Sequence, residues 1–123
     1  MSAAELVAVG LLGGLGALAR FALDWAVSLR FGLRFPFGTL AVNLSGAFVL
    51  GVLAGAGLQG RAYLFAGLAL VGAYTTFSTW MLETHRLAQA GRPRAALTNL
   101  AVSVGVGLLL VALGHALGAA LWG

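Results

Sequence analysis

Four long apolar stretches, separated by three short turns, account for almost the whole chain. Each stretch has about the 20 residues that a helix needs to cross the hydrocarbon core of a bilayer. The turns contain Arg, Gly and Pro, and Pro36 stands where a helix-starting proline is favoured. The pattern predicts four transmembrane helices in one all-α domain over residues 1–123. The expected spans are Glu5 to Leu29, Phe37 to Gly57, Tyr63 to Leu87 and Ala95 to Leu121.

The composition supports an integral membrane protein and excludes a soluble domain. Hydrophobic residues make up 61% of the 123 residues and charged residues 8%, with a mean hydropathy of +1.02. Cysteine is absent and the two histidines, His85 and His115, fall on different predicted helices, so a disulfide or a side-chain metal centre is not expected. No serine has an obvious base at a plausible depth, so we do not expect an enzyme. The net charge of +4 comes from scattered arginines, which does not favour nucleic-acid binding.

The third apolar stretch contains a run of polar residues from Gly72 to Trp80, followed three positions later by Glu83. The run reads Gly-Ala-Tyr-Thr-Thr-Phe-Ser-Thr-Trp. A helix in lipid has no water to satisfy a loosened backbone. A glycine followed by threonines that bond back to the backbone therefore predicts a local break that faces protein or a wet cavity. This break, near the middle of the third helix, is the candidate ion site.

Glycine is frequent, with 19 residues, and pairs at four-residue spacing recur in three of the predicted helices. Such pairs let helix backbones approach closely. Four short helices with so many small faces can hardly enclose a solute path alone, which favours an oligomer. The alternative is that glycine is simply common in membrane helices and in this composition. The pairs are Gly10/Gly14, Gly51/Gly55 and Gly114/Gly118.

Arginines are distributed unevenly between the two ends of the predicted helices. The first and third turns, with the adjoining helix ends, hold five, whereas the opposite end holds only Arg61. The positive-inside rule therefore favours an orientation with both termini outside. Arg20 lies within the first helix and is not part of this count. The five arginines are Arg30, Arg34, Arg86, Arg92 and Arg94.

Three motifs occur in order along the first three helices. They are Gly-Gly-Leu-Gly-Ala-Leu-Ala-Arg at 13–20, Phe-Gly-Thr-Leu-Ala-Val-Asn-Leu-Ser-Gly at 37–46, and Thr-Thr-Phe-Ser-Thr-Trp at 75–80 with Glu83. Together they resemble the Fluc (CrcB) fluoride channel family over the whole chain. The resemblance implies a fluoride-selective channel for passive efflux across the cytoplasmic membrane, which protects against fluoride toxicity. It also implies an antiparallel, dual-topology dimer with two fluoride pathways and a structural sodium ion (Na+) at its centre.

The resemblance further implies roles for particular residues. The backbone carbonyls of Gly72 and Thr75 would hold the sodium ion. The chain departs from the family pattern where Ala73 follows a single glycine and where Trp80 replaces a second phenylalanine. Asn99 could extend the polar lining or cap a helix end. For the fluoride pathway, the resemblance implies a vestibule arginine, a pore-facing amide donor, two pore aromatics and a polar lining: Arg20; Asn43; Phe77 and Trp80; and Thr79, Glu83 and Ser103.

The chemistry of these residues suits the two ions. Fluoride is small and tightly hydrated, so a pore must replace its water with donors, and neutral amides and hydroxyls do so without trapping it. Aromatic edges carry the positive part of the ring quadrupole, so Phe77 and Trp80, at i and i+3, can present edges to an anion. Sodium requires oxygen ligands, which a broken helix supplies as carbonyls. Two such breaks meeting on a twofold axis would double the ligand set.

Simpler interpretations stay open for these residues. Asn43 could join two helices by a hydrogen bond, and the two aromatics could be ordinary packing residues. Ion pairs between residues three or four positions apart could explain two of the charged side chains. These pairs are Arg20 with Asp24 and Glu83 with Arg86.

The assembly and two rival functions also stay open. We expect a homodimer, but the arginine asymmetry suits poorly a subunit that inserts both ways, so a heterodimer with a similar, oppositely oriented subunit is the alternative. A small multidrug exporter also packs four short helices into antiparallel dimers. It needs a titratable carboxylate in mid-membrane on the first helix, whereas Glu5 and Asp24 lie towards the ends of that helix. A non-transporting assembly subunit would explain the glycines but not the polar run.

Overall fold

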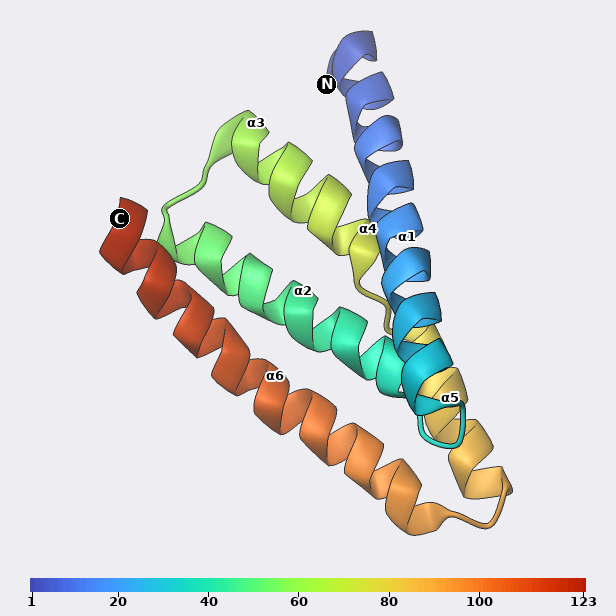
Figure 1. The fold of residues 1–123 in the computed structure, drawn as a ribbon. Helices are drawn as coiled ribbons and strands as arrows, with labels where there is room; N and C mark the ends of the chain where they lie inside the picture. Colours follow the sequence, from blue (N-terminus) through green and yellow to red (C-terminus); the bar gives the residue numbers. More distant parts are fainter.

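A computed structural model describes residues 1–123, and the chain is helical apart from its turns and one internal link. Four segments are long and apolar enough to cross a membrane, which confirms the four predicted spans to within a few residues. The third segment, Gly60–Gln89, is divided into shorter elements (Figure 1). The elements are α1 (Ala3–Phe31), α2 (Phe37–Gly55), α3 (Gly60–Ala62), η1 (Tyr63–Val71), α4 (Gly72–Tyr74), α5 (Ser78–Gln89) and α6 (Pro93–Trp122).

Local sequence explains where the long helices begin and end. The Ser2 hydroxyl accepts a hydrogen bond of 3.1 Å from the Glu5 backbone N–H and caps the start of α1. The residue after α1 is Gly32, whose φ of 80° is a left-handed conformation that glycine adopts without strain. Pro93 is the first residue of α6, where its missing N–H leaves no bond unmade. Ser, Gly and Pro residues therefore mark where the long helices begin and end.

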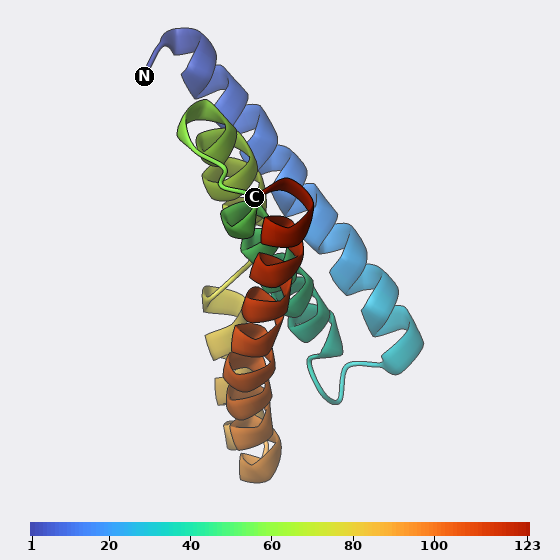
Figure 2. The ribbon, with the colours of Figure 1, turned by 90° about the vertical axis from the view of Figure 1, so that its left-hand side faces the viewer.

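Helices α2 and α6 lie side by side along much of their length (Figure 1 and Figure 2). Two of the predicted glycine pairs form this contact, because a methyl group added at any of the four would collide with the backbone of the opposite helix. The third pair, Gly10/Gly14, has no neighbour within 4 Å of an added methyl group. The contacts are Gly51 against Val111, Gly55 against His115, Gly114 against Phe48 and Gly118 against Val52.

The third segment is interrupted close to its middle, as predicted. Helix α4 ends at Tyr74, Thr75 has extended backbone angles with a ψ of 159°, and α5 begins at Ser78. Figure 1 shows the interruption as a thin link between α4 and α5. The Thr75 hydroxyl donates back to the Val71 carbonyl at 3.3 Å, which is the back-bonding expected of a threonine at a break. Upstream, η1 has the wider winding of a π-helix, which the sequence pattern did not predict.

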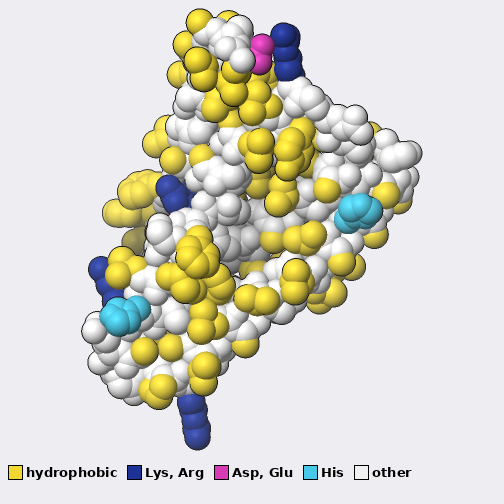
Figure 3. All heavy atoms as spheres, turned by 180° about the vertical axis from the view of Figure 1, so that it is seen from behind, with side chains coloured by type: hydrophobic (Ala, Val, Ile, Leu, Met, Phe, Trp, Pro, Cys, Tyr) yellow, Lys and Arg dark blue, Asp and Glu magenta, His cyan; other side chains and the backbone are white.

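Most large apolar side chains lie on the outside of the molecule. Only 17 of the 123 residues are buried, and Val42 on α2 is the one apolar side chain that is completely inaccessible. Exposed Leu, Phe, Val and Trp side chains follow the outer faces of α1 and α6. Figure 3 shows hydrophobic side chains spread over one whole face, with charges at only a few points. This surface suits a hydrocarbon environment, so the chain is a multi-pass membrane protein.

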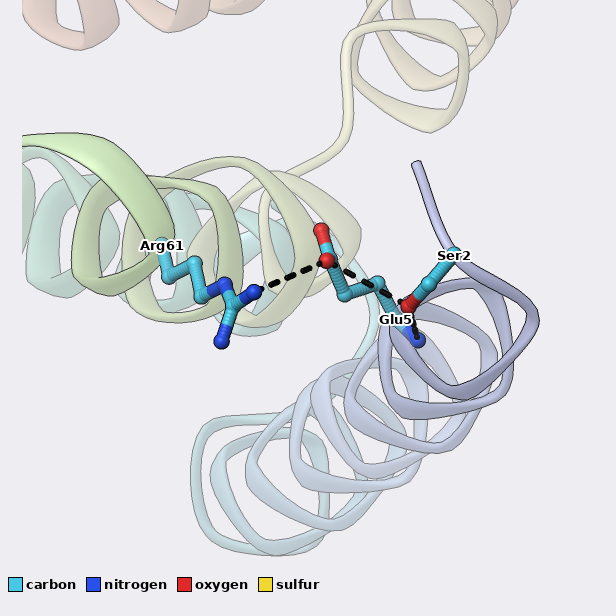
Figure 4. Close-up of polar contacts among 3 residues, drawn as sticks. All are labelled: Ser2, Glu5 and Arg61. Carbon is cyan, nitrogen blue, oxygen red and sulfur yellow. Dashed lines mark hydrogen bonds and ion pairs between the residues drawn. The ribbon is translucent and has the colours of Figure 1, made fainter.

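The two ends of the molecule differ in charge. Arg61 of α3 pairs with Glu5 of α1 at 3.3 Å, and the Ser2 hydroxyl also lies 3.3 Å from the same Glu5 oxygen (Figure 4). This ion pair neutralises Arg61, which is the one arginine at that end of the molecule. At the other end, the Arg92 guanidinium donates to the Arg34 carbonyl and joins the turn after α1 to the start of α6. The five arginines counted in the sequence therefore lie at one end and Arg61 at the other.

Candidate ion pathway at the broken helix

The break in the third segment is held by one side chain of α2. The Asn43 Nδ2 atom donates to the Thr76 carbonyl at 2.9 Å, and the Thr76 backbone N–H donates to Asn43 Oδ1 at 2.9 Å. These bonds satisfy both backbone polar groups of a residue inside the interruption. The interhelical hydrogen bond considered for Asn43 is therefore present. Because an amide nitrogen carries two hydrogens, Asn43 keeps a second donor for another partner.

Two backbone carbonyls lose their helical partners at the break. In a continuous α-helix, the carbonyls of Gly72 and Thr75 would accept from the N–H groups of the residues four positions further on. The Thr76 N–H bonds instead to Asn43 Oδ1, and the Thr79 N–H bonds to the Thr76 hydroxyl at 3.3 Å. The Gly72 carbonyl has only the Thr75 hydroxyl at 3.4 Å. Oxygen atoms released in this way are the ligands that a hard cation prefers.

An open groove of about 410 Å³ lies along the break and brings together five of the residues singled out from the sequence. The rings of Phe77 and Trp80 meet edge to face, with centroids 5.7 Å apart and an interplanar angle of 78°. Phe77 is 69% exposed, so it is not a packing residue within this chain. The five residues are Asn43, Gly72, Thr75, Phe77 and Trp80.

A second, smaller cavity of about 160 Å³ lies between α1, α2 and α5 and contains Arg20 and Thr79. Thr76 lines both this cavity and the groove, so the two adjoin at this residue. Asp24 also lines the cavity but does not pair with Arg20, because the chain's single ion pair is between Glu5 and Arg61. The Ser28 hydroxyl donates to Asp24 instead, at 3.2 Å. The structural ion pair considered for Arg20 is therefore absent.

A third cavity of about 320 Å³, at the arginine-rich end, contains Glu83 together with three arginines. Glu83 forms no ion pair with Arg86, and its Oε1 atom is buried without a partner in the protein. Thr39 and Asp24, which line the second cavity, lie close to the Glu83 carboxylate. Glu83 therefore lies in a polar environment at the arginine-rich end. The three arginines are Arg34, Arg86 and Arg92.

Helix α6 contributes two polar groups that face inwards. The hydroxyl of Ser103 is buried without a partner in the protein. Asn99, which is 1% exposed, takes part in a closed set of hydrogen bonds with Trp80 and Thr84 of α5. Asn99 had two open roles on sequence grounds, and Thr84 was not singled out from the sequence. The signal that was available is the four-residue spacing of Trp80 and Thr84, which places both on one face of a helix.

These features define a class of small helical membrane protein, in which the third span is broken within a polar run and an amide from the second span holds the break. The family described as CrcB-like protein, Camphor Resistance (CrcB), matches residues 7–115. The chain belongs to this family.

Curated relatives cover most of the chain. It is 57% identical over 101 residues to the fluoride-specific ion channel FluC 2 of Mycolicibacterium paratuberculosis, covering 82% of this chain and 83% of that protein. It is 49% identical over 115 residues to FluC 2 of Mycobacterium bovis, covering 94% and 91%. It is 43% identical over 124 residues to FluC 1 of Symbiobacterium thermophilum, covering 95% and 97%. The resemblance identified from the motifs is thus confirmed at the level of the family.

Proposed function

We propose that this protein is a fluoride-selective channel that lets fluoride leave the cell passively across the cytoplasmic membrane and so protects against fluoride toxicity. The observation that carries the proposal is the groove at the broken helix, in which an amide and two aromatic rings meet. Relatives between 43% and 57% identical that are named fluoride-specific ion channels support it. The rival exporter is disfavoured because Glu5 is bound to Arg61 at a helix end, and Asp24 accepts from Ser28.

The proposed pathway begins at the groove and follows the polar groups described above. Asn43 provides a neutral donor, and Phe77 and Trp80 provide aromatic edges. Thr79 and Arg20 line the second cavity, where the arginine would raise the local concentration of anions in a vestibule. Glu83, which lines the third cavity, and Ser103, which lines none of the three cavities, each have a buried polar atom without a partner and would belong to the polar lining.

Selectivity for fluoride would follow from the neutral donors of the groove, which are the Asn43 amide and the edges of the two aromatic rings. A fixed cation at the constriction would bind fluoride too tightly for it to leave, whereas amide and hydroxyl donors replace water without trapping the ion. The edges of aromatic rings attract an anion more weakly than amide and hydroxyl donors do, because they carry only the positive part of a quadrupole.

We further propose that the protein works as an antiparallel, dual-topology dimer with a structural sodium ion at its centre. The Gly72 and Thr75 carbonyls, whose helical N–H partners are bonded elsewhere, would provide two ligands from each subunit. A bound sodium ion would hold the subunits together by attracting carbonyl oxygens of both, and it would not be transported. The unpartnered Gly10/Gly14 face of α1 is compatible with close contact to another helix.

The dimer could contain two copies of this chain or one copy with a similar, oppositely oriented subunit. A homodimer is the simpler proposal. The arginine asymmetry, with five arginines at one end and only Arg61 at the other, favours a subunit that inserts one way. Reconstitution of the purified chain alone decides between the two, since only a homodimer would be active without a partner.

The test is fluoride efflux from liposomes that contain the purified protein alone, read with a fluoride electrode beside a chloride control. Rapid release of fluoride without release of chloride is the expected result. Absence of flux from folded protein, even after reconstitution with an oppositely oriented homologue, would refute the channel. The variant Phe77→Ile should lose fluoride flux. The matched control is Phe31→Ile, because Phe31 is also exposed, at 60%, but lies at the end of α1 outside the groove.

A further inference from the structure

The indole N–H of Trp80 is the strongest donor that either groove aromatic carries. It is directed at α6, since Nε1 lies 3.4 Å from the Asn99 carbonyl oxygen. If the same N–H faced the groove, it would hold a fluoride ion more tightly than aromatic C–H edges do. The direction of this hydrogen bond therefore decides whether Trp80 binds an anion weakly, through its ring edge, or tightly, through its N–H.

One further hydrogen bond joins this turn of α5 to α6, and another lies within α5. The Asn99 side-chain amide donates to the Thr84 hydroxyl at 2.9 Å, and the Thr84 hydroxyl donates to the Trp80 carbonyl at 2.8 Å. The three bonds form a closed loop that begins and ends at Trp80. Because Asn99 is 1% exposed, neither water nor lipid competes for its amide.

We propose that Thr84 and Asn99 are positioning residues for Trp80, which clamp its turn of α5 to α6 and keep the indole N–H on the Asn99 carbonyl. Fluoride then meets the edge of the ring and not the N–H. This inference rests on the proposed function. The inference applies only because residue 80 is tryptophan, since a phenylalanine ring has no N–H that a clamp could restrain.

The direct test observes the indole N–H. The variant W25F/W122F leaves Trp80 as the only one of three tryptophans, so its ¹H–¹⁵N indole resonance is unambiguous in the full-length protein. While Thr84 is present, we expect sodium fluoride to shift this resonance only slightly, because the ion meets the ring edge and the N–H stays bonded to Asn99. After Thr84→Val the shift with fluoride should be several-fold larger, with no such increase for chloride. Fluoride shifts of equal size before and after the substitution would overturn the proposal.

Fluoride efflux from liposomes provides the second test. We expect Thr84→Val to slow efflux roughly three- to tenfold, which corresponds to the loss of about one interhelical hydrogen bond in a membrane. Thr84→Ser keeps the hydroxyl and should restore the rate. The control Thr98→Val removes a similar hydroxyl bond to Arg94, but on the exposed side of α6, and should have no effect.

A double substitution separates positioning from a purely structural role. In the W80F background no N–H remains, so W80F/T84V should transport fluoride at the rate of W80F alone. A further slowing of the same size as that caused by Thr84→Val alone would overturn the proposal. Absence of fluoride flux from the unsubstituted protein would instead refute the proposed function, and the two failures are therefore distinguishable.

Discussion

Asn43→Leu is the substitution that most directly tests how the broken helix is held. It replaces an amide by an apolar group of similar shape and removes both bonds to Thr76, each of 2.9 Å. Interhelical hydrogen bonds in membranes average about 0.6 kcal/mol and reach about 1.7 kcal/mol, so two bonds contribute roughly 1 to 3 kcal/mol. Loss of about 2 kcal/mol corresponds to a roughly 30-fold change in the unfolding equilibrium.

The assay is reversible unfolding in mixed detergent micelles with increasing SDS, followed by far-ultraviolet circular dichroism. Protein concentration is held constant, because the free energy of unfolding of an oligomer depends on it. The control is Thr98→Val, which removes a hydroxyl bond of 2.8 Å on the exposed side of α6. We expect the control to change the free energy of unfolding by less than about 0.5 kcal/mol.

Equal free energies of unfolding for Asn43→Leu and Thr98→Val would contradict this role of Asn43. In that case the Thr76 backbone groups would find equivalent partners elsewhere, and Asn43 would not hold the break. A drop well above about 3 kcal/mol would indicate that the unpaired Thr76 groups are left without any partner, since a buried orphan group costs about 1 to 3 kcal/mol.

Two further predictions concern the packing and the charge of the molecule. Gly114→Ala should lower the free energy of unfolding by about 1 to 3 kcal/mol relative to Gly10→Ala in the same SDS assay. Both variants gain helix propensity, but only the first forces a methyl group against the α2 backbone; equal stabilities would contradict the glycine contact. Replacement of Arg34 and Arg86 by Gln should slow fluoride efflux at low ionic strength, and the difference should fade towards 1 M salt, where the Debye length is about 3 Å. Arg61→Gln is the control, since Arg61 lies at the opposite end, and an equal effect there would contradict the role of the arginine-rich cavity.

The elements that follow from local sequence were predicted well. The spans follow from the apolar runs, and the interruption follows from a threonine hydroxyl that bonds within its own turn, from Thr75 to Val71. Three glycine pairs were recognised as places where helix backbones could approach closely, and two of them form the contact between α2 and α6 within the chain. The π-helical winding of η1 was missed, since an apolar run carries no signal for the register of its backbone hydrogen bonds.

The relations between distant residues were harder to predict. Asn43 was recognised as polar, but its partner lies 33 positions away and the sequence does not name it. The pair of Arg20 with Asp24 was plausible from spacing alone, yet Asp24 accepts from Ser28, which lies four positions beyond it on the same helix. The loop through Thr84 and Asn99 needs α5 and α6 side by side, which only the packed structure provides.

The bonds between Asn43 and Thr76 also bear on how the chain is made. A ribosome delivers N-terminal segments first, so α2 reaches the membrane before the third segment does. A broken helix entering lipid alone would expose backbone groups that nothing there can satisfy. Here the amide that closes the break belongs to the preceding span and is already in the bilayer when Thr76 arrives. Because α2 precedes the third segment along the chain, the broken helix has a hydrogen-bonding partner as soon as it enters the membrane.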